Sequence, residues 1–139
     1  MDKRHNLEME FHDQREADRK KLSKDQFEKK YPNKRLYKIS SNTSMYIQRL
    51  LARSIKKDHK FLDYCCGTGE TAKEAAAFTK NVYAIDISPK SVSSALENVR
   101  NVIPDIDRSN FRPMNAESTE FENEYFDDSF LQFHAISEI

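Results

Sequence analysis

The chain has 139 residues, and its 23 Lys and Arg balance its 23 Asp and Glu, so the formal net charge is zero. This length fits one small domain or part of a larger one. No apolar run approaches the ~20 residues that a membrane-spanning helix needs, so the composition excludes an integral membrane protein and leads us to expect a cytoplasmic one.

Residues 1–57 are expected to form a helical N-terminal extension. The segment 6–22 is helix-prone and polar, with a thin apolar stripe of Leu7, Phe11 and Ala17. A Ser followed three residues later by Gln is a capping-box pattern, which predicts a short second helix just before the Tyr-Pro pair. A third helix is expected in residues 40–57, where apolar residues recur at helical spacing: Ile47, Leu50, Leu51 and Ile55.

Lys and Arg crowd the first 35 residues, a pattern that could indicate a nucleic-acid-binding surface. Acidic residues interleave with these cations: Glu8, Glu10, Asp13, Glu16 and Asp18. Mixed charge of this kind is more typical of a solvated helix face. We therefore expect no nucleic-acid partner and no membrane partner.

From residue 58 onward the pattern alternates between short apolar runs and helix-prone segments. Strands are expected at 60–65 and 81–86, each followed by a helix, at 70–80 and 88–103. Ser88 is placed to cap the second of these helices, with a proline at the first helical position.

Two weaker strands follow, at 109–114 and 129–136, on either side of an acidic loop. Pro113 lies inside the first of them and removes a ladder donor, which predicts an edge position.

Strands that alternate with helices imply parallel pairing through right-handed crossovers. The predicted fold class is therefore α/β, a doubly wound, mostly parallel Rossmann-like sheet formed by residues 58–139. Only four strand patterns are present, so we expect an incomplete sheet whose exposed edge offers a route to self-association.

The 2 cysteines, Cys65 and Cys66, are adjacent. Neighbouring residues on a strand point to opposite faces, so the pair is a poor disulfide and has no metal-ligand spacing. We expect buried or partly buried thiols and no structural metal.

The only 2 glycines of the chain, Gly67 and Gly69, lie between the first strand and the helix that follows it. In a sheet of this type, ligands bind at the carboxyl ends of the strands, where a glycine lets a ligand approach the backbone. With Ala72 they satisfy the dinucleotide pattern G-x-G-x-x-A, and Asp86 lies near the offset of a ribose-binding acid. This pattern alone is compatible with a nicotinamide or flavin nucleotide.

Asp63 argues against a dinucleotide. It ends the first strand, and a pyrophosphate on the glycine loop would meet its carboxylate at a cost of about 1–4 kcal/mol. A ligand with an ammonium group would instead be attracted. S-adenosylmethionine carries such a group, together with a ribose and an adenine.

Each part of S-adenosylmethionine has an expected partner. Asp63 faces the amino group, directly or through water, and the backbone from Cys65 to Gly69 holds the methionine portion. Asp86, with Ile87 beside it, accepts the ribose hydroxyls. The segment after the third strand serves the adenine. The expected cofactor-binding residues are Asp63, Cys65, Gly67, Gly69, Asp86, Ile87, Asn115, Ala116 and Glu117.

The stretches "FLDYCCGTGETA", "VYAIDISPKSV" and "NAESTEFENEYFD" together resemble motifs of class I S-adenosylmethionine-dependent methyltransferases. The resemblance covers about residues 60–127 and implies a Rossmann-like methyltransferase. The leader "NLEMEFHDQREAD" is similar to that of members with small-molecule substrates, which implies a small metabolite as methyl acceptor.

The sequence departs from this family in two ways. Cys65 stands where the first glycine of the family's motif is usual, so the turn has to accept a Cβ. The patterns also stop at a fourth strand, whereas the family domain has seven, so we expect only the cofactor-binding half of the domain. We assign no catalytic residue, and His134 is not assigned as one. A non-catalytic remnant and an NAD(P)-dependent oxidoreductase remain as alternatives.

Overall fold

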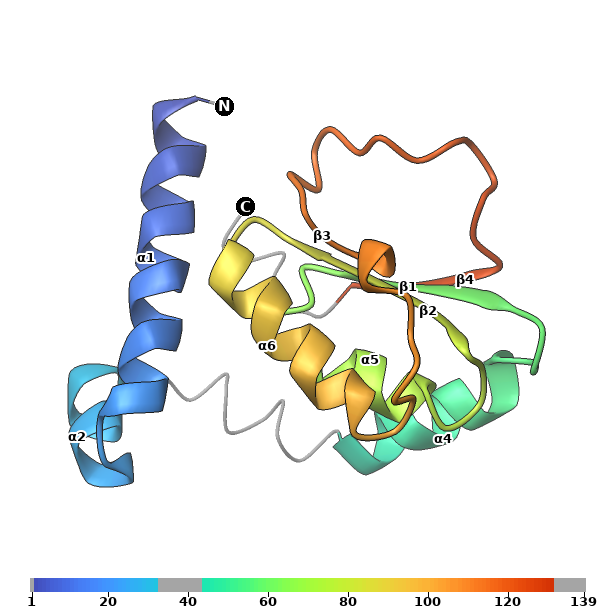
Figure 1. Ribbon diagram of the computed structural model, residues 1–139, viewed down its shortest axis with the longest axis horizontal. Coiled ribbons are helices and arrows are strands. Elements are labelled where there is room, and N and C mark those ends of the chain that lie inside the picture. The colour runs from blue at the N-terminus through green and yellow to red at the C-terminus, as the bar shows by residue number, and fades with distance from the viewer. Residues whose placement is uncertain (1, 33–43, 132–139) are drawn as a thin grey trace.

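The computed structural model describes residues 2–32 and 44–131 (Figure 1). Three helices of this part precede the first strand, and short helices then alternate with strands. The elements in chain order are α1 (Lys3–Lys21), α2 (Lys24–Lys30), α4 (Ser44–Ser54), β1 (Lys60–Tyr64), α5 (Glu70–Ala75), β2 (Asn81–Asp86), α6 (Pro89–Arg100), the 3-10 helix η1 (Arg108–Asn110), β3 (Phe111–Pro113) and β4 (Asp128–Leu131).

The strands form one parallel sheet in the order β3-β2-β1-β4. This confirms the α/β fold class and the Rossmann-like arrangement. β3 is an edge strand, which confirms the position predicted from Pro113. β4 begins at Asp128, and the part of the predicted strand beyond Leu131 lies outside the described residues. Self-association through the β4 edge stays a prediction.

The sheet reverses its direction of growth after β3. The crossovers through α5 and α6 lie on one face of the sheet, and the connection from β3 to β4 passes over the other face (Figure 1). Right-handed crossovers require this change of face when the strand order reverses. β1 and β4 therefore flank the topological switch point, where sheets of this kind bind their ligands.

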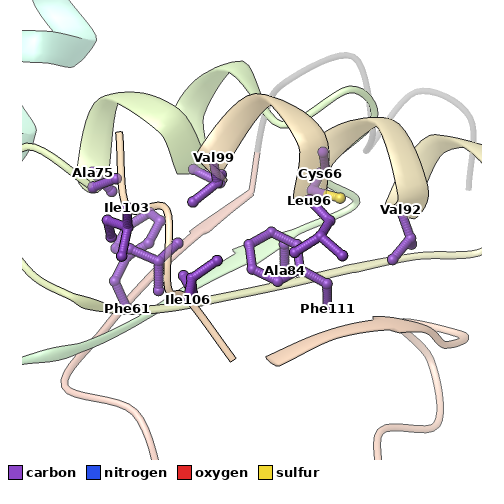
Figure 2. Close-up of a cluster of buried hydrophobic side chains, with 14 of the residues drawn as sticks. Phe61, Cys66, Ala75, Ala84, Val92, Leu96, Val99, Ile103, Ile106 and Phe111 are labelled. Atoms are coloured by element: carbon purple, nitrogen blue, oxygen red, sulfur yellow. The ribbon is translucent and has the colours of Figure 1, made fainter. Parts of the chain in front are cut away.

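The helix-covered face holds the hydrophobic core. Figure 2 shows the apolar side chains of α6 directed at those of the strands below them. Alternate strand residues point toward the helices, as a period of two demands. The core residues labelled in the figure are Phe61, Cys66, Ala75, Ala84, Val92, Leu96, Val99, Ile103, Ile106 and Phe111.

The opposite face is covered by the loop between β3 and β4 in place of a helix. Leu62 and Ile85 are fully buried on this face. Aromatic rings of the loop cluster against Tyr83, whose hydroxyl lies 3.2 Å from that of Tyr125. Lys60 adds a cation over the Tyr125 ring, 4.2 Å from its centroid. Because these rings are large, a loop suffices to bury the strand residues.

The N-terminal helix docks through polar contacts. The predicted apolar stripe does not pack inward, since Leu7 is 58% exposed and Phe11 is 53% exposed. Glu16 is instead buried, and its Oε1 accepts a hydrogen bond of 2.5 Å from Ser94 Oγ of α6. The prediction of a solvated acidic face is therefore wrong for this residue and for Asp18, which is also buried.

Hydrogen bonding explains how these acids tolerate burial. Burial acts to raise the pKa of Glu16, but hydrogen bonds from Arg19 and Ser94 outweigh it and lower the pKa. Hydrogen bonds from Lys30 and Tyr31 lower the pKa of Asp18 to about 2. Both carboxylates thus remain charged and paired within the helical extension. In the described part of the chain, no helix is long and apolar enough to cross a membrane.

The contact between α1 and α6 gives a prediction about stability. Replacing Ser94 by Ala removes a buried hydrogen bond to a charged group, and we expect the free energy of unfolding to fall by about 1.5–3 kcal/mol. Urea denaturation followed by circular dichroism measures this loss. Ser93 is exposed on the same helix, so Ser93→Ala is the matched control and should change little. Equal stability of the two variants would contradict the buried contact.

Candidate functional site

The candidate site lies where β1, β2 and β3 end. The carboxyl ends of parallel strands meet at one edge of the sheet, so the loops that follow them are neighbours. A backbone hydrogen bond joins two of these loops, from Met114 N to Asp86 O at 2.9 Å. The predicted site residues of the first, second and third strand are thereby brought to the same edge.

The loop after β1 is held by its neighbours. Gly67 N donates a hydrogen bond of 2.9 Å to Asp86 Oδ2 at the end of β2. From α6, Asn98 Nδ2 donates to Thr68 O at 2.7 Å. One bond comes from the sheet and the other from a helix, so the loop is anchored on both sides. Sequence reasoning did not find Asn98, since nothing in the pattern of α6 distinguishes it from a solvated residue.

The two glycines are needed for different reasons. Both have positive φ, 53° at Gly67 and 78° at Gly69. A Cβ at Gly67 would meet nothing within 4 Å, whereas a Cβ at Gly69 would lie 2.7 Å from Ala95 Cβ. Gly67 therefore borders open space that a ligand can fill, as predicted for a ligand-site floor. Gly69 allows the loop to pack closely on α6, a role that sequence reasoning did not separate from ligand binding.

Cys65 adopts the same left-handed conformation, with φ of 52°. This is the position at which the sequence departs from the expected glycine, and the turn accepts the Cβ with backbone strain. Cys65 is partly exposed and Cys66 is buried, and the two do not form a disulfide with each other, which confirms the predicted burial of the pair. Burial raises the pKa of the Cys66 thiol, so this group stays protonated.

Asp63 is buried beneath the loop, with only 1% of its surface exposed. Its Oδ2 accepts a hydrogen bond of 3.1 Å from Ala72 N in the first turns of α5. Among the described residues, its Oδ1 has no hydrogen-bond partner. Burial raises the pKa of Asp63 to about 8. Burial therefore favours the neutral form of the carboxyl group in the ligand-free chain, and a cationic partner would favour the ionised form.

Both carboxylate oxygens of Asp86 accept hydrogen bonds from backbone N–H groups. Oδ2 binds the N–H of Gly67, and Oδ1 accepts a hydrogen bond of 3.0 Å from Ser88 N. An ionised carboxylate has about four lone-pair sites, so each oxygen keeps capacity for one further donor. Ile87, which lies between Asp86 and Ser88 in the chain, is partly exposed. The arrangement leaves Asp86 able to accept the hydroxyls predicted for it.

The segment after β3 is ordered by its own side chains. Glu117 N donates a hydrogen bond of 3.0 Å to Asn115 Oδ1, which forms a tight turn around Ala116. Glu117 also pairs with Arg4 of α1, and its Oε2 lies 3.1 Å from His5 Nε2. The first turn of α1 thus contacts the segment predicted to bind adenine. Sequence reasoning missed this contact, because more than 100 residues separate the partners.

A concavity of the described chain lies away from these loops. It has a volume of about 310 Å³ and is bordered by α4 and β4, with Leu50, Ile55 and Phe130 in its lining. None of the predicted site residues lines it. His134 lies outside the described residues. Within the described ranges 2–32 and 44–131, no cluster of three or more His, Cys, Asp or Glu is placed to hold a metal ion.

A comparison with protein families adds an independent finding. The family model described as "Methyltransferase domain" matches residues 61–138, which is more than half of the chain. The match begins in β1 and includes every residue predicted to bind the cofactor. No curated protein and no solved structure matches the chain significantly.

Because the two glycines have different roles, we expect their substitution to lower the free energy of unfolding by different amounts. Ala at either position is strained by the positive φ, but only at Gly69 does the new Cβ collide with α6. We expect Gly69→Ala to lower the free energy of unfolding by about 1–3 kcal/mol more than Gly67→Ala does, the usual range for overpacking. Chemical denaturation of both variants measures the difference. Equal losses would show that the close approach to Ala95 is not limiting.

At Cys65 we expect a substitution to raise the free energy of unfolding. Cys65→Gly relieves the left-handed strain and also increases the entropy of the unfolded chain. We expect a net gain of about 0.5–1 kcal/mol in the free energy of unfolding, from the larger strain term. Thermal and urea denaturation test this, with Cys65→Ser as the control that keeps the Cβ. A loss of stability on substitution with glycine would contradict the strained turn.

Proposed function

Because the chain belongs to the methyltransferase-domain family, we propose that it binds S-adenosylmethionine at the carboxyl ends of β1, β2 and β3. We propose further that it acts on a small metabolite in the cytoplasm. The observation that carries the cofactor assignment is the buried Asp63 carboxyl with one unpartnered oxygen, beside a glycine loop that borders open space.

The carboxyl group of Asp63 fits the amino end of this cofactor. A buried polar atom without a partner is costly and is usually retained for a function. An ammonium group, directly or through one water, supplies the missing partner for Oδ1. It also favours the ionised form of the carboxyl, which burial disfavours. A pyrophosphate carries no cation to stabilise the ionised form of this carboxyl, so a nicotinamide dinucleotide offers Oδ1 no charged partner.

The other residues fit the remaining parts of the cofactor. The absence of a Cβ at Gly67 leaves room for the methionine portion against the loop backbone. Asp86 keeps acceptor capacity for the two ribose hydroxyls. Asn115, Ala116 and Glu117 offer a backbone edge and side chains to the adenine at the same edge of the sheet.

S-adenosylmethionine, when bound, supplies a methyl group that its sulfonium has already activated for displacement. The task of the protein is then to hold the methyl donor and the acceptor in line and to exclude water. In this chain, the rigid loop from Cys65 to Gly69 fixes the donor end, and Asp86 fixes its ribose. The small acceptor is proposed from the leader, which resembles that of members acting on small molecules.

Calorimetry tests the cofactor directly. We expect heat on titration with S-adenosylmethionine and none with NAD at equal concentration. Asp63→Asn should weaken binding of S-adenosylmethionine by about 10- to 100-fold, the effect of losing a hydrogen bond to a charged group. Asp58→Asn is the matched control, because Asp58 is exposed before β1. Heat with NAD alone would contradict the proposal, and an unchanged affinity of Asp63→Asn would remove Asp63 from the site.

Proton release gives a second test of the same contact. Asp63 is protonated in the free chain below about pH 8, so binding of an ammonium beside it releases a proton. At about pH 6.5 an α-amino group already carries its proton and does not obscure the release. Calorimetry in two buffers of different ionisation enthalpy should show close to one proton released by the wild type and none by Asp63→Asn. Equal proton counts would contradict the assignment.

The raised pKa of Asp63 also predicts how stability depends on pH. The pKa rises from its ordinary 3.8 to about 8 on folding, so the unfolded chain loses this proton first. The contribution of the neutral carboxyl is complete below about pH 4 and is lost as the pH rises to about 8. Asp63→Asn removes this loss. The variant should therefore gain stability over the wild type from pH 5 to pH 8, as measured by denaturation at each pH; a constant difference would contradict the burial of an unpaired carboxyl.

A further inference from the structure

The N-terminal helix α1 contacts the candidate site at two places. Its first turn lies against the segment after β3, and its middle lies against the turn between β2 and α6. Both contacts are made by side chains of α1 with charged or polar groups. The two places are the segments proposed to hold the adenine and the ribose.

The first contact centres on Glu117. Arg4 Nη2 lies 2.9 Å from Glu117 Oε1 and 3.1 Å from Oε2. His5 is 8% exposed, and its two ring nitrogens lie 3.1 Å from Glu117 Oε2 and 3.4 Å from Asn115 Nδ2. Asp2 caps the helix by accepting a hydrogen bond from His5 N. The orientations of Asn115 and Glu117 are therefore set by α1 as well as by their own turn.

The second contact is formed by Asp13. Its Oδ1 accepts hydrogen bonds from Ser88 Oγ at 2.5 Å and from Lys90 N at 3.2 Å. Ser88 in turn donates its N–H to Asp86 Oδ1. A carboxylate at this place also satisfies a free N–H in the first turn of α6 and interacts favourably with its dipole. Asp13 thus fixes the residue that orients the proposed ribose-binding carboxylate.

From these contacts we propose that Arg4, His5 and Asp13 are positioning residues of the cofactor site, and that docking of α1 and binding of the adenosine part of S-adenosylmethionine are coupled. This inference rests on the proposed function. Arg4 and His5 act through Glu117 and Asn115, and Asp13 acts through Ser88. Since coupling is reciprocal, the cofactor tightens the docking of α1 by the same factor by which docked α1 tightens the cofactor.

The way α1 is attached makes such coupling effective. Its apolar residues Leu7 and Phe11 are exposed, so no apolar stripe fixes the helix independently of these polar contacts. Exposed ion pairs are individually weak, and Arg4 and Glu117 are both about half exposed. The buried hydrogen bond from Ser94 to Glu16 also holds the helix. A helix held by polar contacts still undocks more readily than one with a buried apolar face, which leaves its position open to influence from the cofactor.

The experiment is a double-mutant cycle on cofactor affinity. The dissociation constant of S-adenosylmethionine is measured by calorimetry for the wild type, Arg4→Ala, Glu117→Ala and the double variant. We expect Arg4→Ala to weaken binding by about 2- to 5-fold, the range set by an exposed ion pair. In the Glu117→Ala background the same substitution should have a smaller effect, because the contact between Arg4 and Glu117 is already lost.

Lys20→Ala is the matched control. Lys20 lies on the same helix and approaches Glu97 of α6 at 4.0 Å, away from the site loops. Because this ion pair is long and exposed, it contributes little to docking, and Lys20→Ala should leave the dissociation constant nearly unchanged. Thermal melting of each variant shows that the chain remains folded. If Arg4→Ala fails to fold, Arg4→Lys and Asp13→Asn provide milder changes, for which we expect weaker cofactor binding in the same direction.

Hydrogen exchange supplies a readout that a purely structural role would not change. Saturating S-adenosylmethionine should slow amide exchange throughout α1 of the wild type, and this protection should be lost in Arg4→Ala. The inference would be overturned if Arg4→Ala and the wild type bind S-adenosylmethionine with equal affinity, or if the cofactor does not change the amide exchange rates of α1. Neither result would contradict the proposed function. A wild-type chain that does not bind S-adenosylmethionine would overturn both.

Discussion

Two carboxyl groups at the ends of neighbouring strands fix the geometry on which the site depends. Asp63 at the end of β1 accepts the N–H of Ala72, and Asp86 at the end of β2 accepts the N–H of Gly67. The bond from Ala72 joins α5 to β1. The bond from Gly67 joins the loop between β1 and α5 to β2. The loop from Cys65 to Gly69 therefore has a single conformation, and its left-handed residues are held there against their intrinsic preferences.

The same constraint leaves a cost that a ligand can remove. Asp63 is enclosed so completely that burial favours its neutral form, and one of its oxygens has no partner among the described residues. A fold selected for stability alone would place an apolar residue or an amide there. Strained and unsatisfied groups that persist in a well-packed region are typical of functional sites. In this chain they coincide with the strained Cys65 and with the open space at Gly67, which is why we locate the cofactor there.

Local sequence signals predicted most of the fold and part of the site. The capping box at Ser23, the Ser88 cap with its proline and the edge proline Pro113 all act within a few residues, and the structure confirms each of them. Long-range contacts were not predictable in this way. The contact of Gly69 with Ala95, the burial of Asp63 and the polar docking of α1 each depend on how distant segments pack. The acids of α1 illustrate the limit, since a buried Glu16 paired with Ser94 has the same local pattern as a solvated one.

An NMR titration tests the location of the site most directly. The chain is labelled with ¹⁵N, and amide shifts are followed as S-adenosylmethionine is added. The account predicts that the largest changes occur at Gly67, Ile87 and Ala116, one in each of the three loops at the carboxyl ends of the strands. Changes confined to the groove between α4 and β4, or no changes at saturating cofactor, would contradict it.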